Sequence, residues 1–113
     1  MTSSAQRQAP KLLVVGDDLS GTADSAVACV RCAMRARVVL DAHGATNSAP
    51  SASPFAANEH VDVLAVDTDS RRLIASEAMA VTAEAWQVFG AGRRLFKKID
   101  STLRGNIAAE ICA

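Results

Sequence analysis

The sequence is poor in the residues that build metal sites, disulfides and nucleic-acid surfaces. Among 113 residues there are two His, three Cys and no Tyr, and aromatic residues make up only 4%. Twelve basic side chains balance twelve acidic ones, so the net charge offers no attraction to nucleic acid or to an anionic membrane surface. No apolar run approaches the roughly 20 residues that cross a bilayer. A His-rich metal site is excluded, and we expect neither a nucleic-acid partner nor a membrane partner.

The few cysteines and the N-terminus indicate a reducing compartment. An odd number of cysteines without a secretory signal favours free thiols in a cytoplasm. Residues 1–10 are polar and lack the hydrophobic core of a signal peptide, so we interpret them as a disordered leader. Cys29 and Cys32 have C-x-x-C spacing inside a helical pattern without a second pair, which favours core packing over redox or zinc chemistry.

Apolar strand-like runs alternate with helical patterns along the chain. The patterns predict strands at 11–15, 37–40, 61–66 and 94–99, helices at 22–35 and 74–89, and the start of a further helix from Arg104 onward. This alternation predicts an α/β fold with right-handed crossovers: an open, mainly parallel sheet flanked by helices, as in part of a doubly wound domain. We expect the strand order to be about 2-1-3-4. Residues 11–113 then form one incomplete domain, with a flexible loop at 42–60.

Polar clusters follow three of the four predicted strands. They are residues 16–22, 67–72 and 97–106. Because open α/β sheets bind ligands beyond the carboxyl ends of their strands, we expect the three clusters to converge on one binding crevice.

The first cluster has the glycine spacing of a P-loop but not its chemistry. Thr22 follows Gly21 where a P-loop needs Lys, and the neighbouring pair Asp17 and Asp18 would repel phosphates, so a nucleotide P-loop is improbable. Two adjacent carboxylates can accept hydrogen bonds from hydroxyls, supply a general base or bind a divalent cation. The competing interpretation is that one of them only caps the next helix, although Thr22 or Ser20 could also do so.

The second and third clusters also allow two interpretations. Residues 67–72 suit either substrate binding or a helix-capping turn with solvated arginines. By strand alternation Lys98 and Asp100 share one face, as a ligand-binding pair or as an ion pair at the sheet edge. Arg104 opens the expected last helix, where a guanidinium and the helix N-terminus can hold an anion, unless the arginine only forms a surface salt bridge.

The three clusters together resemble the N-terminal sugar-binding domain of the four-carbon acid sugar kinase family. The resemblance is carried by Gly16–Asp24, Asp67–Arg71 and Lys97–Asn106, in family order, and covers the chain from residue 11 to its end. Ser20 and Thr22 stand where the family more often has Thr and Ala. Family members are several times longer and carry a C-terminal ATP-binding domain that this sequence does not include.

The resemblance implies a function and a set of site residues. The chain would be the substrate-binding part of an ATP-dependent kinase that phosphorylates a terminal hydroxyl of threonate, erythronate or a 3-oxo-tetronate. Asp18 is the candidate base, and Arg104 or Lys98 would pair with the substrate carboxylate. The full set of implied substrate-binding residues is Asp17, Asp18, Ser70, Arg71, Lys98, Asp100, Arg104 and Asn106.

The resemblance also implies partners and cofactors. ATP and Mg²⁺ belong to the complete enzyme, and we expect no cofactor or metal on this chain alone. The expected partners are a small sugar acid and a nucleotide-binding domain, which a separate chain could supply. An inactive truncated fragment is the alternative. A signalling receiver domain, mimicked by Asp17, Asp18, Asp67 and Lys98, is less favoured because only one helix is predicted between Asp67 and Lys98.

Overall fold

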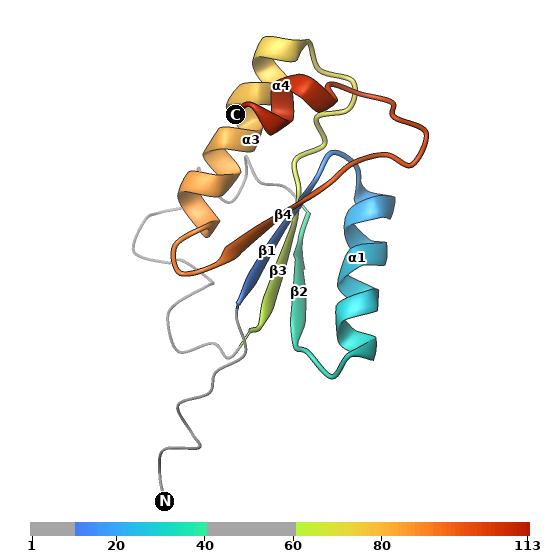
Figure 1. Ribbon diagram of the computed structural model, residues 1–113, viewed down its shortest axis with the longest axis vertical. Coiled ribbons are helices and arrows are strands. Elements are labelled where there is room, and N and C mark those ends of the chain that lie inside the picture. The colour runs from blue at the N-terminus through green and yellow to red at the C-terminus, as the bar shows by residue number, and fades with distance from the viewer. Residues whose placement is uncertain (1–10, 41–60) are drawn as a thin grey trace, which may run out of the picture.

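The computed structural model describes residues 11–40 and 61–113 (Figure 1). The expected leader at 1–10 and the expected loop at 42–60 therefore lie outside the described residues. The described elements are β1 (Leu12–Gly16), α1 (Leu19–Arg31), β2 (Ala36–Val39), β3 (Val63–Asp67), α3 (Ala75–Phe89), β4 (Arg94–Lys98) and α4 (Ile107–Ile111).

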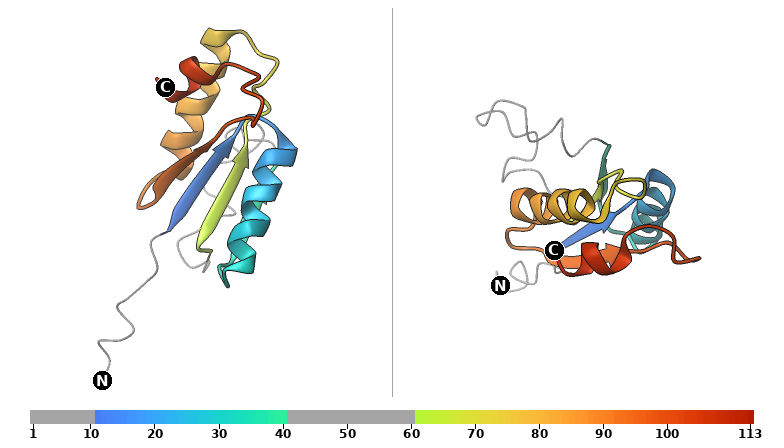
Figure 2. Two further views of the ribbon diagram at one scale, coloured as in Figure 1. Left: turned by 45° about the vertical axis from the view of Figure 1, so that its right-hand side comes forward. Right: turned by 90° about the horizontal axis from the view of Figure 1, so that it is seen from above.

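The strands form one parallel sheet with helices on both faces, which confirms the predicted α/β class. Every pair of neighbouring strands runs parallel, in the order β2-β3-β1-β4. Helix α1 covers one face, whereas α3 lies across the other with α4 beside it (Figures 1 and 2). No helix among residues 11–40 and 61–113 is long and apolar enough to cross a membrane.

The expected strand order 2-1-3-4 is wrong in its inner pair, because β3 lies between β2 and β1. All five residues of β3 are buried, as suits a strand with a neighbour on each side. Strand β2 is shorter, carries Arg37 and buries only Val39, so it takes the edge. In both the expected and the observed order, β1, β3 and β4 are three consecutive strands of the sheet. The carboxyl ends of these strands therefore still lie together, as expected.

Alternating side chains of the inner strands fill two separate cores. Leu13 and Val15 of β1 join the core under α3, where Phe89 closes it, and Val14 joins the core under α1. Cys29 packs against this second core, but Cys32 is exposed, so the core-packing interpretation is wrong for Cys32. Both are free thiols.

Helix α1 begins at Leu19, three residues before the expected start at Thr22. Asp18 is the N-cap, and its Oδ1 accepts a hydrogen bond from the Gly21 amide at 3.1 Å. Thr22 is fully buried, and its hydroxyl donates back to the Asp18 carbonyl at 2.6 Å. The expected caps, Thr22 and Ser20, are therefore wrong.

The segment after β4 also differs from the prediction. The strand ends at Lys98, so Asp100 does not share a strand face with Lys98 but lies in the loop beyond it. Helix α4 starts at Ile107 rather than at Arg104. Leu103 and Gly105 have φ values of 61° and 90°, which no right-handed helix accommodates, so Arg104 lies in a loop between them.

Candidate functional site

The ends of three strands bring the polar clusters to one level of the sheet. Gly16, the last residue of β1, is in register with Asp67 of β3 on one side and with Lys98 of β4 on the other. The chain leaves all three strands at the same end of the sheet (Figure 1). Residues that follow these strands can therefore meet although they lie far apart in the sequence.

Arg71 joins the clusters that follow β3, β1 and β4. Its Nε and Nη2 donate to the two carboxylate oxygens of Asp17 at 3.2 and 3.1 Å. Nη2 also lies 3.1 Å from Asp18 Oδ1 and 3.5 Å from Asp100 Oδ1. The hydrogen bonds to Asp17 raise the pKa of Arg71 above its already high value, so the guanidinium stays charged.

Asp17 is a fixed support of this cluster. Its side chain is buried, and its carbonyl accepts the amides of Ser70 and Arg71 at 3.0 and 3.3 Å. Gly105 approaches the same carboxylate so closely that a Cβ there would lie 2.7 Å from Asp17 Oδ2. With its φ of 90°, position 105 therefore requires glycine.

The carboxylate of Asp100 is surrounded by hydrogen-bond donors of its own loop. It accepts hydrogen bonds from Arg104 Nε at 2.7 Å, Arg104 Nη2 at 3.0 Å, the Arg104 amide at 3.1 Å and the Thr102 hydroxyl. The Arg104 side chain, and after it the Thr102 hydroxyl, hold the pKa of Asp100 far below its usual range. The loop that carries Arg104 is thus folded around the carboxylate of Asp100, whose charged form it stabilises.

Exposure separates the groups that can meet a ligand from those that support them. The side chains of Asp17 and Asp100 are 5% and 8% exposed, but those of Asp18 and Arg104 are 29% and 65% exposed. Within the described part of the chain, Asp18 Oδ2 and Arg104 Nη1 make no hydrogen bond. The surface of the cluster therefore offers a free acceptor on Asp18 and a free donor on Arg104. Nη1 of Arg71, whose side chain is 21% exposed, also makes no hydrogen bond among the described residues.

The remaining predicted site residues are bonded within the protein. Lys98 Nζ donates to the Ile99 carbonyl, and its side chain lies along Gly21 at the start of α1. Asn106 Nδ2 donates to the Leu73 carbonyl at 2.6 Å. Ser70 is fully buried, so the structure does not bring its hydroxyl to the exposed side of the Arg71 cluster. The substrate contacts expected of these three residues stay predictions.

Two acidic residues near the site were not among the predicted site residues. Glu110 is 3% exposed, and its Oε1 accepts hydrogen bonds from Ser70 at 3.1 Å and Thr82 at 3.3 Å and forms an ion pair with Lys97 at 3.0 Å. Asp67 is buried at the end of β3, where burial, and then its acidic neighbours, raise its pKa, while its bond from the Asp69 amide opposes that rise.

The cluster is not built as a metal site. Among residues 11–40 and 61–113, no three or more His, Cys, Asp or Glu side chains gather so that they could hold a metal ion. Both oxygens of Asp17 and of Asp100 already accept hydrogen bonds from guanidinium groups. These residues do not fit Mg²⁺, so the arrangement does not favour the divalent-cation interpretation of the acidic pair.

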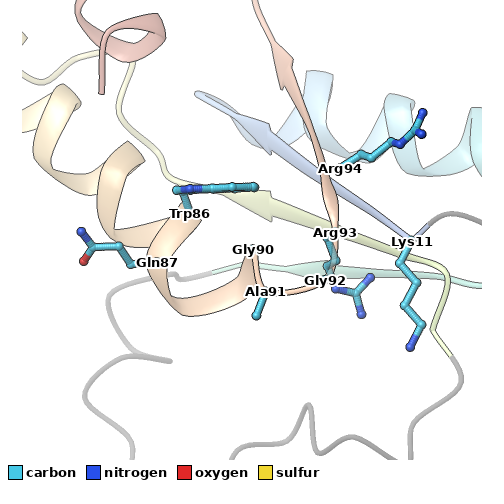
Figure 3. A pocket seen from close by; sticks show the side chains of 8 residues that line it. All are labelled: Lys11, Trp86, Gln87, Gly90, Ala91, Gly92, Arg93 and Arg94. Atoms are coloured by element: carbon cyan, nitrogen blue, oxygen red, sulfur yellow. The ribbon is translucent and has the colours of Figure 1, made fainter.

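An open cavity of about 660 Å³ lies at the opposite end of the sheet (Figure 3). Its lining includes Trp86 and the basic side chains of Lys11, Arg93 and Arg94. Arg93 is occupied by the carbonyls of residues 12, 61 and 62, and burial lowers its pKa. Arg94 points away from Arg93 and Lys11, so the cations do not converge on one ligand position.

The chain is similar to known proteins over most of its length. It matches the family model of the sugar-binding N-terminal domain over residues 12–113. It is 47% identical over 102 residues to a D-threonate kinase of Cupriavidus necator and 33% identical over 104 residues to a D-erythronate kinase of Heliobacterium modesticaldum. These matches cover 89% and 90% of this chain but 22% of each relative. The chain thus spans less than a quarter of the length of these two relatives.

A solved structure supports the fold. The crystal structure of a domain of unknown function from Bordetella bronchiseptica is 40% identical in sequence and matches with a TM-score of 0.70. The match covers 91% of this chain and 25% of that one. That protein was crystallised as a domain-swapped dimer with bound citrate.

Proposed function

The chain belongs to the family of sugar-binding N-terminal domains, and from that premise we propose that it is the substrate-binding part of an ATP-dependent kinase acting on four-carbon sugar acids. The names of its relatives support threonate and erythronate as the substrate class. One observation within the chain carries the proposal: the Arg71 cluster leaves an acceptor on Asp18 and a donor on Arg104 at its surface.

A four-carbon sugar acid carries one carboxylate and neighbouring hydroxyls, and each finds a partner in this arrangement. The side chain of Arg104 is more exposed than that of Arg71, so we assign Arg104 to the substrate carboxylate, with Lys98 as the second candidate. Asp18 accepts a hydrogen bond from a substrate hydroxyl. The side chains of Asp18 and Arg104 are held in place by their neighbours. Arg71, which Asp17 fixes, pairs with Asp18, and Asp100 binds Arg104.

Asp18 is also the proposed general base. Its bonds to the Gly21 amide and to Arg71 both engage Oδ1, so Oδ2 is left to take the proton of an attacking hydroxyl. Ser70 and Asn106 remain proposed contacts. Because both bond within the protein, a substrate reaches them only when those bonds exchange.

ATP would supply the phosphoryl group in the complete enzyme, with Mg²⁺ offsetting its charge. The described residues do not fit the metal, and the glycine-spaced turn after β1 carries Asp17 and Asp18 where phosphates would have to lie. We therefore propose that a nucleotide-binding domain outside this sequence holds both. The alternative, an inactive fragment, predicts no sugar-acid binding.

Calorimetric titration of the chain with D-threonate, D-erythronate and threitol tests the proposal. Threitol is a matched control because it keeps the four-carbon polyol and lacks the carboxylate. We expect saturable one-to-one binding of a sugar acid, about tenfold or more tighter than threitol, because a charge-assisted bond to Arg104 is lost with the carboxylate. If neither sugar acid binds, the inactive-fragment alternative holds. If threitol binds equally well, the carboxylate assignment is wrong.

A further inference from the structure

Glu110 is a buried carboxylate to which the proposed function gives no role. It lies on α4, and its Oε1 contacts three other parts of the fold through two hydrogen bonds and one ion pair. The hydrogen-bond donors are Thr82 of α3 at 3.3 Å and Ser70 of the loop after β3 at 3.1 Å, and Lys97 of β4 forms the ion pair at 3.0 Å. The Oε1 atom of Glu110 thus connects α4 to β4, to α3 and to the loop after β3.

A short path of bonds leads from Glu110 to the site. Ser70 is fully buried, and its hydroxyl contacts Glu110 at 3.1 Å and the Thr68 hydroxyl at 2.7 Å. Its amide donates to the Asp17 carbonyl at 3.0 Å, and the next residue is Arg71. Both ends of Ser70 are therefore fixed directly before the arginine that joins Asp17, Asp18 and Asp100.

Anchoring of α4 alone would not require a carboxylate here. Helix α4 has five residues, and Glu110 is the one residue in it that is buried. A buried carboxylate costs desolvation free energy, which an apolar side chain of similar size would avoid. What a leucine could not supply is an acceptor for the Ser70 and Thr82 hydroxyls and a partner for Lys97.

We propose that Glu110 is a positioning residue, which fixes the Ser70 hydroxyl and thereby holds Arg71 in the geometry that orients Asp18 for the substrate. The importance of this for catalysis rests on the proposed function. The arrangement of Arg71 itself can be measured without any substrate.

The test uses the Arg71 Nε–Hε signal in ¹H–¹⁵N spectra of the ligand-free chain. In Glu110→Ala and in Ser70→Ala, we expect the solvent exchange of this proton to rise about tenfold, the scale of one lost hydrogen bond to a charged group. Glu110→Gln keeps an oxygen acceptor for Ser70, so it should restore most of the protection. The matched control is Thr82→Val, which removes a donor to the same oxygen on the α3 side and should leave Arg71 unchanged.

The variants separate positioning from plain stabilisation. If Glu110 only anchored α4, Glu110→Ala would lower the urea midpoint while Arg71 kept its slow exchange in the folded protein, and the proposal would be overturned. Should Glu110→Ala not fold, Ser70→Ala decides, because it leaves Glu110, Lys97 and Thr82 in place. Unchanged exchange in a folded Ser70→Ala variant overturns the proposal.

A D-threonate titration of the same variants then connects Glu110 to binding. We expect the affinity to fall about tenfold in Glu110→Ala and to recover in Glu110→Gln. If the unaltered chain binds no sugar acid, the proposed function fails while the Arg71 exchange rates still decide the role of Glu110. If the chain binds and Arg71 responds but affinity does not change, Glu110 positions Arg71 without serving the substrate, and that part of the proposal is wrong.

Discussion

Two residues of the cluster face solvent, and the others support them. The carboxylate oxygens of Asp17 and Asp100 accept hydrogen bonds from the guanidinium groups of Arg71 and Arg104, which fixes the base of the site. Asp18 and Arg104 keep one free atom each toward solvent. A polar surface built in this way suits the proposed ligand, which carries both an anionic group and hydroxyls.

Arg104→Ala is expected to weaken D-threonate binding by about tenfold to a hundredfold, the range for one hydrogen bond to a charged partner. Calorimetry measures the change. Arg94→Ala is the matched control, because Arg94 is an exposed arginine at the other end of β4. Equal affinities for the unaltered chain and Arg104→Ala would rule out Arg104 as the carboxylate ligand.

Gly105→Ala is expected to destabilise the fold by about 2 kcal/mol or more, through the positive φ and the displacement of Asp17. Gly92→Ala introduces only the strain of the positive φ, since Gly92 has a φ of 72° but no atom lies within 4 Å of a Cβ built there. This variant should lower the free energy of unfolding by about 1 kcal/mol. Urea unfolding compares the two variants. Equal losses would show that residue 105 does not press on Asp17.

Asp67→Asn is expected to raise stability at neutral pH. Burial raises the pKa of Asp67, so the stability that its protonated form contributes is present in acid and is lost as the pH rises through the folded pKa. Asparagine stays neutral and can still accept the Asp69 amide. Urea unfolding across a pH series should show the advantage of the variant shrinking toward acid, and an advantage that grows in acid would contradict the assignment.

Asp100 contributes to acid sensitivity with the opposite sign. Its pKa is held below the usual range by Arg104 and Thr102, so its stabilisation is present above the unfolded pKa and is lost as the pH falls toward the folded value. The two carboxylates therefore pull the pH dependence in opposite directions.

Residue types at the site were predictable, whereas their partners were not. Polar runs after three strands predicted that Asp18, Arg71 and Arg104 lie close together, because parallel sheets place such ends together. The Arg71–Asp17 pair spans 54 positions, and the Glu110–Ser70 contact spans 40. Nothing local in an Ala-rich helical run distinguishes a buried Glu110 from a solvated glutamate, so its role appears only after folding.

At the scale of elements, the N-cap of α1 is Asp18, which is also the proposed substrate contact and general base. Asp18→Ala removes the cap and should cost about 1 kcal/mol of stability as well as substrate affinity. Asp18→Asn keeps a good capping side chain but loses the carboxylate, so it should retain stability and lose affinity. Urea unfolding and D-threonate calorimetry measure the two effects. An Asp18→Asn variant that binds like the unaltered chain would remove Asp18 from the site.

The positions of strands and helices followed from the sequence to within a few residues, because apolar runs and helical periodicity are local signals. Their spatial order did not. Both β1 and β3 are apolar enough for interior positions, so their sequences do not decide which of them lies beside β2 and which beside β4. The start of α4 was also missed, since Leu103 takes a positive φ that its residue type does not predict.

At the scale of the whole molecule, the two ends of the sheet differ in chemistry. The carboxyl ends of β3, β1 and β4 carry the Arg71 cluster, whereas the open cavity between Trp86 and Arg94 lies at the other end. In that cavity the basic side chains either bond to backbone carbonyls or point apart. A sugar acid should therefore bind at one end of the sheet and leave the other unaffected.

The most direct test is a ¹H–¹⁵N amide spectrum of the chain titrated with D-threonate and D-erythronate. We predict a dispersed spectrum in which the shifts are confined to the amides around Asp18, Arg71 and Arg104. The amides of residues 86–94, at the opposite end, serve as the internal control and should stay in place. Shifts centred on residues 86–94, or no shifts with either sugar acid, would contradict a substrate site at the carboxyl ends of the three strands.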